Sequence, residues 1–417
     1  MNFSSSEPLY ACEMTDPVLS DRHRILSQIL RMNAPSFEEL TELGEIDLSQ
    51  ENHRVRILGL IQQLQLIEMR STTDGAVAER RIFGIELVDP RDGQIVHCHL
   101  TTHTPVRTQN LCNSTLLRGQ LVGIEATIIN RQLVCLEVSF PGLPSRQIHL
   151  TESEQTIASI SDLHVGSRFH NERLIHAGIE CLNRYARERR ISAVTITGDL
   201  IEGFRPERPK DYTITQIDKQ YEHLGQLLRL IDSSLDVFVI PGNHDLYPVE
   251  GTDRFEKMFE PQPVFPSEIR QLIDPPSNIH LLTNPATIQI DGRTLLLHHG
   301  DSFHTFNTQL PPYRWDDPIR NMRHQLELRH LDPMRVARNS TGRDPMCVRE
   351  VPDVYITGHI HLHRLESFNG VQLINASTFQ DRTGFQEEIG LVPEPGFITL
   401  TRLSDLHLSS VDLQLRT

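Results

Sequence analysis

The sequence of 417 residues predicts an α/β (α+β) chain in which a small β-barrel precedes a larger domain of β-sheets flanked by helices. Five short strand-like runs, separated by turn signals, lie between residues 54 and 141, and this spacing suits a barrel. Beyond about residue 155, apolar strand-like runs instead alternate with helical stretches, as in sheets covered by helices. Polar residues directly follow several of these later runs, where α/β folds usually place their sites.

Changes in composition divide the chain into four segments. Residues 1–51 form an acidic segment with two short helical patterns, the second of which begins at the capping box of Ser36 and Glu39. Residues 52–143 hold the five strand-like runs, and we expect an OB-fold there. Residues 144–153 are predicted to be a linker, and residues 154–417 are predicted to form the larger domain.

Composition limits the class of protein. A formal net charge of −15 is unfavourable for a stand-alone nucleic-acid-binding protein, because attraction to phosphates needs local positive charge. The six cysteines are scattered without a C-x-x-C pair, which predicts a reduced, cytoplasmic chain without thiolate zinc sites. The first residues show no pattern of a secretory signal, and no run approaches 18 apolar residues, so we expect no association with a membrane.

Seven potential metal ligands follow the strand-like runs of the second half in a fixed order. They are Asp162, His164, Asp199, Asn243, His299, His359 and His361. Taken singly these motifs are weak, since D-x-H is often a strand-end turn and G-D is an ordinary turn dipeptide. Together they predict a two-metal site in which Asp199 is well placed to bridge the cations. Paired metals beside a free histidine are suited to the cleavage of phosphate esters.

Two motifs carry specific expectations for the chemistry. Pro241 and Gly242 predict a sharp turn that presents Asn243, His244 and Asp245 at the sheet edge. His244 is predicted to act as the general acid, while Asp245 orients it and raises its pKa.

The LLLHHGD motif leaves a choice between two histidines, because strand alternation lets only one of them face the site. We prefer His299 as the ligand, which places His298 in packing or beside the ligands. His363 shares a face with His359 and His361, and it is expected to contact substrate or to lie on the surface.

The ordered series D-x-H, G-D, G-N-H-D, H-G and G-H-x-H resembles the signature of the calcineurin-like metallophosphoesterases over about residues 155–380. The resemblance implies a calcineurin-like β-sandwich domain with two divalent metal ions. Mn²⁺ is the first expectation, and Fe, Zn²⁺ and Mg²⁺ are the alternatives. It further implies one metal held by Asp162, His164, Asp199 and His361, and another held by Asp199, Asn243, His299 and His359.

A narrower resemblance rests on EPQPVFP at 260–266, KQYEHLGQLL at 219–228, RHLDP at 329–333, VPDVYITGHIH at 351–361 and NASTFQDRTGFQ at 375–386. These segments are similar to the small subunit of archaeal family D DNA polymerases. The resemblance implies a proofreading 3′→5′ exonuclease that acts on a DNA 3′ end and is partnered by a large catalytic polymerase subunit. The alternatives are a nucleotide or small-molecule phosphodiesterase or phosphatase, and a non-catalytic assembly subunit.

Two further features bear on the binding of DNA. Residues 314–349 contain eight arginines and five acids, which is typical either of a strand-guiding edge beside the metals or of a solvated helical face. The barrel contains only two aromatic residues, Phe83 and Phe140, and therefore lacks a platform for base stacking. We expect it to contact protein, namely the large subunit.

Overall fold

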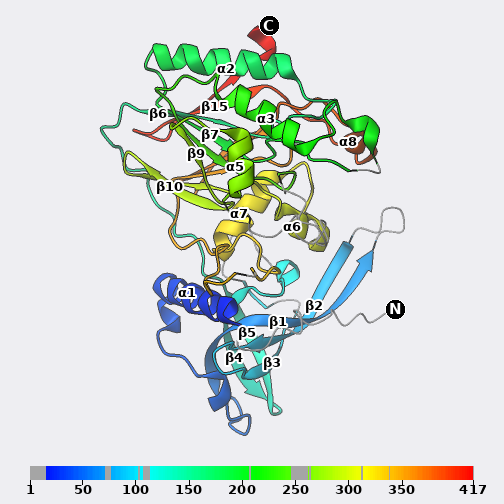
Figure 1. Ribbon diagram of the computed structural model, residues 1–417. Coiled ribbons are helices and arrows are strands. Elements are labelled where there is room, and N and C mark those ends of the chain that lie inside the picture. Colours follow the sequence, from blue (N-terminus) through cyan, green and yellow to red (C-terminus); the bar gives the residue numbers. More distant parts are fainter. Residues whose placement is uncertain are drawn as a thin grey trace. The chain divides into compact units, whose positions relative to one another are not determined.

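The computed structural model describes residues 16–70, 77–101, 104–106, 113–205, 208–245, 262, 264–310, 313–337 and 339–416. The chain divides into two compact units that do not follow sequence order (Figure 1). The first contains the chain up to residue 144 together with 302–314 and 320–351, and the second contains 145–301, 315–319 and 352–417. The first 15 residues of the expected 1–51 segment, and the EPQP part of the 260–266 motif apart from Gln262, lie outside the described residues. The four segment boundaries remain predictions.

The first unit is built on a closed five-stranded barrel, as the sequence predicts. Its strands are β1 (Arg54–Arg70), β2 (Val77–Val88), β3 (Ile95–His99), β4 (Leu121–Ile129) and β5 (Gln132–Ser139), in the order β1-β2-β3-β5-β4. Asn130 and Arg131 join β4 to β5, and both have positive φ, as a tight hairpin turn requires. Ile57, Ile85 and Ile124 point into the barrel and are fully buried.

Helices from distant parts of the sequence complete this unit. Helix α1 (Pro17–Asn33) begins at Asp16, whose carboxylate accepts hydrogen bonds from the first free backbone amides of the helix. Helices α6 (Phe303–Gln309) and α7 (Pro318–Leu328) lie near the middle of the second half of the chain. Phe306 of α6 and Leu328 of α7 nevertheless belong to the hydrophobic core of the barrel.

A buried ion pair also joins distant segments of the first unit. The Arg22 side chain of α1 is fully buried, and its Nε donates to the Asp344 carboxylate at 2.6 Å. The same guanidinium donates to the carbonyl oxygens of Gly119 and Pro333, so one side chain ties together three segments. His330 Nε2 lies 3.0 Å from the Asp344 carboxylate. With Cys347, His330 and Asp344 could in principle hold a metal, but the guanidinium already balances the carboxylate charge.

The second unit is a sandwich of two β-sheets. One sheet contains, in spatial order, β16 (Leu408–Asp412), β15 (Phe397–Arg402), β6 (Thr156–Ile160), β7 (Ala193–Thr197), β8 (Asp236–Ile240) and β9 (Ile279–Leu281). The other contains β10 (Ala286–Ile290), β11 (Arg293–Leu297), β12 (Val354–Thr357), β14 (Val371–Ala376) and β13 (His363–Phe368). Ile157 and Ile240 of the first sheet pack with Leu295 and Ile374 of the second, which forms the inner core.

Helices cover the outer face of the six-stranded sheet (Figure 1). These helices are α2 (Glu172–Arg187), α3 (Ile217–Leu228) and α5 (Ser267–Ile273). A further short helix of this unit, α8 (Gly384–Glu388), follows β14 in the sequence. The arrangement confirms the predicted sandwich flanked by helices. No helix in the described part of the chain combines the length and apolarity needed to cross a bilayer.

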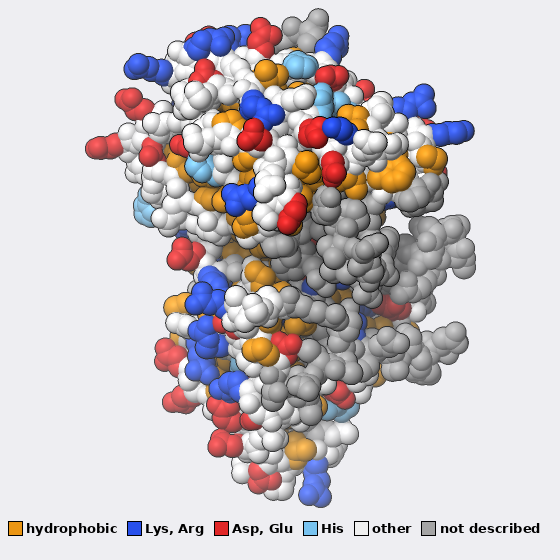
Figure 2. All heavy atoms as spheres, viewed as in Figure 1, with side chains coloured by type: hydrophobic (Ala, Val, Ile, Leu, Met, Phe, Trp, Pro, Cys, Tyr) orange, Lys and Arg blue, Asp and Glu red, His pale blue; other side chains and the backbone are white. Residues whose placement is uncertain are grey.

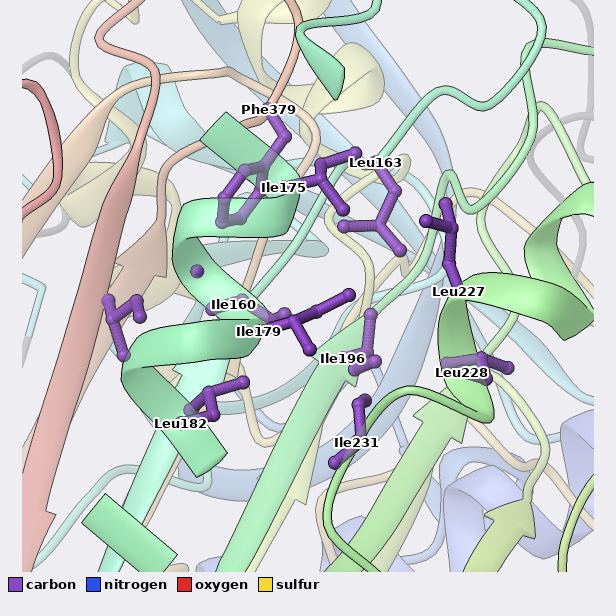
Figure 3. Close-up of a pocket in the computed structure, with 12 residues that line it drawn as sticks. Ile160, Leu163, Ile175, Ile179, Leu182, Ile196, Leu227, Leu228, Ile231 and Phe379 are labelled. Atoms are coloured by element: carbon purple, nitrogen blue, oxygen red, sulfur yellow. The ribbon is translucent and has the colours of Figure 1, made fainter. Parts of the chain in front are cut away.

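Figure 3 shows a small cavity between α2 and the sheet, of about 20 Å³. Ile179 and Leu182 of α2 face Leu163, Ile196 and other apolar side chains across it. Such a space holds at most about one water molecule and offers it no polar partner, so we expect it to be dry. Leu163 lies between two predicted ligands in sequence, so this apolar layer directly supports the end of β6.

Replacement of Arg22 by Met is expected to destabilise the protein by about 3–5 kcal/mol, because it leaves the Asp344 carboxylate buried without its partner. Urea unfolding followed by circular dichroism would measure the change. Arg402→Met is the matched control, because it makes the same change in the solvent-exposed pair with Asp405, and it should have a much smaller effect on stability. Equal effects of the two substitutions would contradict the structural role of Arg22.

Stability should fall as the pH decreases from about 6.5 to about 4. Burial lowers the pKa of His324 to about 3 and that of His330 to about 4. In this pH range these two residues therefore bind protons in the unfolded chain but not in the folded chain. Each such proton lowers the free energy of unfolding by up to about 1.4 kcal/mol for each unit by which the pH falls. His324→Gln should reduce the slope of unfolding free energy against pH. An unchanged slope in this variant would remove His324 from the effect.

Candidate metal centre

The predicted ligands lie at the carboxyl ends of five strands of the second unit. Asp162 and His164 follow β6, Asp199 follows β7, Asn243 follows β8, His299 follows β11, and His359 and His361 follow β12. The strands β6, β7 and β8 are parallel neighbours, as are β11 and β12, so their ends meet at one edge of the sandwich. The structure brings all seven predicted ligands together there, with His244 beside them.

Two sets of three predicted ligands are each compact enough to surround one cation. The ligand atoms of each set lie within 4.8 Å of one another, and the sets are Asp162, His164 and His361, and Asp199, His299 and His359. A third set of the same compactness combines His164 and Asp199 with His244. Asp199 Oδ2 lies 3.7 Å from His164 Nε2 of the first set and 3.2 Å from His299 Nε2 of its own. Asp199 therefore has the position of a bridging carboxylate. Asn243 Oδ1, at 3.0 Å from His299 Nε2, adds a neutral oxygen to the second set.

Three histidines have one ring nitrogen fixed from outside the cluster. His164 Nδ1 lies 2.8 Å from the Glu202 carboxylate, and His299 Nδ1 lies 2.7 Å from the Thr197 carbonyl oxygen. His244 Nδ1 lies 2.9 Å from the Glu202 carbonyl oxygen. Each Nδ1 donates to an oxygen acceptor, which sets the tautomer and leaves Nε2 facing the centre. This is how ligating imidazoles are normally oriented around metals.

The charge balance of the cluster favours cations. Asp162 and Asp199 are buried at its centre, and the side chain of Glu202 is 13% exposed beside them. Within the described part of the chain, the ion pairs of these carboxylates all involve histidines, and none involves lysine or arginine. Buried carboxylates without permanent counter-charges are costly, and oxygen and imidazole ligands together suit borderline divalent metals. The donor set therefore fits a pair of divalent cations.

The backbone at the centre adopts a conformation that non-glycine residues rarely use. Five predicted ligands have φ between 49° and 69°, namely Asp162, His164, Asp199, His359 and His361. Left-handed backbone at non-glycine residues costs on the order of 1–3 kcal/mol each and tends to cluster at functional sites. Close approach also requires glycine at 358, where a Cβ would lie 1.9 Å from Ser161 Oγ and 2.3 Å from Asp162 Oδ2.

Comparison with known protein families identifies this constellation. The calcineurin-like phosphoesterase profile matches residues 155–363, which contain the whole ligand series. The chain belongs to the calcineurin-like phosphoesterase family. Its centre is therefore that of a metal-dependent phosphoesterase.

Individual relatives are proteins named DNA polymerase II small subunit. The one from Thermoplasma acidophilum is 28% identical over 373 residues, which cover 86% of this chain and 69% of the relative. The one from Methanothermobacter thermautotrophicus is 31% identical over 293 residues, covering 67% and 58%, respectively. The one from Pyrococcus furiosus is 27% identical over 406 residues, covering 94% and 62%. This chain thus spans between 58% and 69% of the length of these relatives.

Electrostatics in the phosphoesterase centre follow from the paired histidines and carboxylates. Burial alone would lower the pKa of His299, but the adjacent Asp199 carboxylate raises it to about 10. Burial opposes ionisation of Glu202, yet the His164 and His244 rings lower the pKa of its carboxyl group to about 2. Burial lowers the pKa of His359 to about 3. Against the effect of burial, the neighbouring histidines also lower the pKa of the Asp162 and Asp199 carboxyl groups, so these two ligands are ionised.

The two adjacent histidines of the phosphoesterase's HHGD motif have different surroundings. His299 contacts Asp199 and Asn243 in the centre. His298 instead has its Nδ1 2.9 Å from Asn284 Oδ1, and it is completely enclosed by protein. The geometry favours His299 as the ligand, in line with the preference drawn from the sequence.

The role expected for Asp245 requires correction. Its carboxylate accepts hydrogen bonds from the backbone amides of Leu200, Ile201 and Gly242, and not from the His244 ring. It therefore fixes the turns after β7 and β8 relative to each other. Burial, together with the Asp199 charge, raises the pKa of Asp245 to about 7, whereas burial lowers the pKa of His244. Asp245 positions the backbone at the site and does not raise the pKa of His244.

Sequence reasoning missed three residues that hold the ligands in place. Glu202 contacts both His164 and His244, and Gln380 Nε2 donates to the Glu202 carboxylate at 2.7 Å. Gln386 Nε2 lies 2.9 Å from His361 Nδ1. The signal for Glu202 was its place three residues after Asp199 in GDLIE. Both glutamines lie in the STFQDRTGFQ segment, which was noted for resemblance only.

Replacement of Glu202 by Gln should weaken the binding of Mn²⁺ by about 10- to 100-fold, because the His164 ring loses its anionic acceptor. Isothermal titration calorimetry on the metal-depleted protein would measure this affinity. Glu188→Gln makes the same chemical change at an exposed position and should leave the affinity unchanged. Unaltered Mn²⁺ affinity in Glu202→Gln would show that this contact does not support the metal centre.

Proposed function

We propose that this chain is the small subunit of a family D-type DNA polymerase, and that its dinuclear centre is a 3′→5′ exonuclease that hydrolyses DNA phosphodiesters for proofreading. The proposal of catalysis rests on the complete set of predicted ligands. They form two compact groups of three, and Asp199 of one group also lies close to His164 of the other. The printed names of the relatives support the polymerase part. A purely assembling subunit would have no need for buried carboxylates on strained backbone.

The residues of the centre suggest how cleavage proceeds. Two bound divalent ions, which we propose to be Mn²⁺, would supply Lewis-acid polarisation of the phosphoryl oxygens. The His244 backbone amide donates to Asp199 Oδ1 at 2.8 Å, and its Nδ1 is held by the Glu202 carbonyl. Its Nε2 lies 4.0 Å from Asp199 Oδ2 and therefore faces the centre. A water molecule would attack the phosphorus of the terminal phosphodiester, forming a new P–O bond as the bond to the 3′-oxygen of the penultimate nucleotide breaks. In the imidazolium form, His244 Nε2 donates its proton to this departing 3′-oxygen, and the terminal nucleoside monophosphate is released.

A large catalytic subunit is the proposed partner, since the relatives are named as small subunits. The barrel is suited to such a contact. Phe140 is buried within it, so Phe83 is the one aromatic ring it exposes. A single ring is a poor platform for stacking successive bases.

The arginine-rich segment 314–349 gives little support to a strand-guiding edge. Arg329 is buried and donates to the carbonyl oxygens of Val348 and Arg349. Arg349 itself pairs with Asp21 of α1, and Arg335 lies near Asp332. These three arginines organise the first unit and are not available as a continuous surface for DNA.

His244→Asn should slow the degradation of a 5′-labelled primer with a mismatched 3′ end by about 10²- to 10⁴-fold, which is the usual contribution of a general acid. Mn²⁺ binding, measured by calorimetry, should be retained, because the ring is not among the predicted ligands. The exposed His176→Asn serves as the matched control and should keep the wild-type rate. Full exonuclease activity in His244→Asn would exclude it as the acid.

Removal of the metals by EDTA is expected to abolish primer degradation, and Mn²⁺ should restore it. The same assay separates the proposal from its alternatives. A protein that binds Mn²⁺ and hydrolyses bis(p-nitrophenyl) phosphate, but leaves every DNA end intact even with the co-purified large subunit, would be a small-molecule phosphodiesterase. Bound Mn²⁺ without hydrolysis of either substrate would indicate an assembly subunit.

A further inference from the structure

An exposed aromatic ring lies next to the metal centre in a segment that the chemistry above does not use. Phe385 of α8 is 51% exposed, although most large apolar side chains of the described residues are buried. Its neighbour Gln386 is buried, and the Gln386 amide nitrogen lies 2.9 Å from the ring of the predicted ligand His361. Phe385 is thus the neighbour in sequence of a residue that contacts the centre directly.

The first turn of α8 fixes the directions of these two side chains. Thr383 caps the helix, with its hydroxyl accepting from the Gln386 backbone amide at 3.2 Å. In return, Gln386 Oε1 accepts from the Thr383 backbone amide at 3.0 Å, which directs the other end of the amide towards His361. Successive residues of a helix point about 100° apart. Because Gln386 points inwards to His361, Phe385 points in a different direction, and its ring is exposed to solvent.

A cation accompanies this ring. The guanidinium carbon of Arg208 lies 5.8 Å from the centroid of the Phe385 ring. Arg208 is 40% exposed, and its pairing with Glu388 of α8 at 3.7 Å keeps it over the helix. In the sequence, Arg208 follows the ligand Asp199 by nine residues and Glu202 by six. Phe204 and Tyr212, which lie on either side of Arg208 in the sequence, form an aromatic pair whose ring centroids are 5.1 Å apart.

Figure 2 shows hydrophobic side chains at the surface over the position that α8 has in Figure 1. Ile389 and Val392 add to the exposed apolar surface after the helix. Apolar surface alone could equally contact protein. An exposed aromatic ring beside a guanidinium group instead matches the chemistry of single-stranded nucleic-acid binding, in which bases stack and cations neutralise phosphates.

We propose that Phe385 and Arg208 form a stacking site for the nucleobase at an unpaired DNA 3′ end, so that they select single-stranded termini for the metal centre. The inference rests on the proposed exonuclease function. A base in a duplex is already stacked and paired, whereas an unpaired terminal base can turn out of the helix at lower cost. The platform favours frayed and mismatched ends over matched ones without reading the identity of the base, since every base has a π-face.

The test compares three variants of the full chain in steady-state degradation of a 5′-labelled single-stranded oligonucleotide. Phe385→Ala should raise KM by roughly 5- to 150-fold, which corresponds to the loss of one stacked base. Phe385→Trp should retain the wild-type KM, because indole also stacks. Ile389→Ala removes a similarly exposed apolar group, 47% exposed, and should change nothing. Hydrolysis of bis(p-nitrophenyl) phosphate should be the same in all variants.

Several outcomes would overturn the stacking site. These are a wild-type KM in Phe385→Ala, an equal rise in KM for Ile389→Ala, and a parallel loss of aryl phosphodiester hydrolysis, which would indicate a structural role. A direct readout is the quenching of 2-aminopurine placed at the 3′ terminus, which should occur with the wild type and be lost in Phe385→Ala. That readout needs no cleavage. If the wild type quenches 2-aminopurine but degrades no DNA, the exonuclease function fails while the stacking site stands.

Discussion

The enclosure of three carboxylates among histidines at the strand ends, two of them buried and the third, Glu202, partly buried, is the constraint on which the rest of the second unit depends. Each ionised carboxylate removed from water costs several kcal/mol unless charge and hydrogen bonds compensate it. Each of Asp162, Asp199 and Glu202 lies beside a histidine ring, which offsets part of this cost. The oxygen and imidazole groups that face the centre also form a donor set that suits cations. The left-handed backbone adds strain to the same place. Such a centre persists because a large apolar sandwich holds the strand ends in register.

Local pattern was sufficient to predict the strands and their polar ends. Runs such as VFVI and LLL are apolar throughout, as expected for strands buried on both faces, and the ligands follow them closely. The assignment of 302–314 and 320–351 to the barrel unit could not be predicted in this way. Periodicity shows that a helix has an apolar face, but it does not show which core receives it. Phe306 and Leu328 enter the barrel core from a distance of well over a hundred residues in sequence.

The roles of Asp245 and Glu202 show the same limit within the site. Adjacency in NHD suggested that Asp245 orients His244, yet neighbouring residues in a turn point in different directions. The carboxylate of Asp245 turns back to three backbone amides and thereby locks the β7 and β8 turns together. Glu202 performs the orientation, from another loop, by offering its carbonyl oxygen to His244 and its carboxylate to His164. Spacing in sequence identified the polar residues but could not assign their partners.

Support of the ligands and exposure of a binding surface coincide in one short segment. Gln380 and Gln386 reach inwards to Glu202 and His361, while Phe385 between them in sequence reaches outwards. The segment that contains them, NASTFQDRTGFQ, is also one of the five segments on which the resemblance to the polymerase small subunits rests. General phosphoester chemistry requires only the ligands, so a segment that fixes the ligands and also shapes the approach to them is where substrate choice can be encoded. A change in α8 would then alter which phosphodiester reaches the centre without altering the ligand set itself.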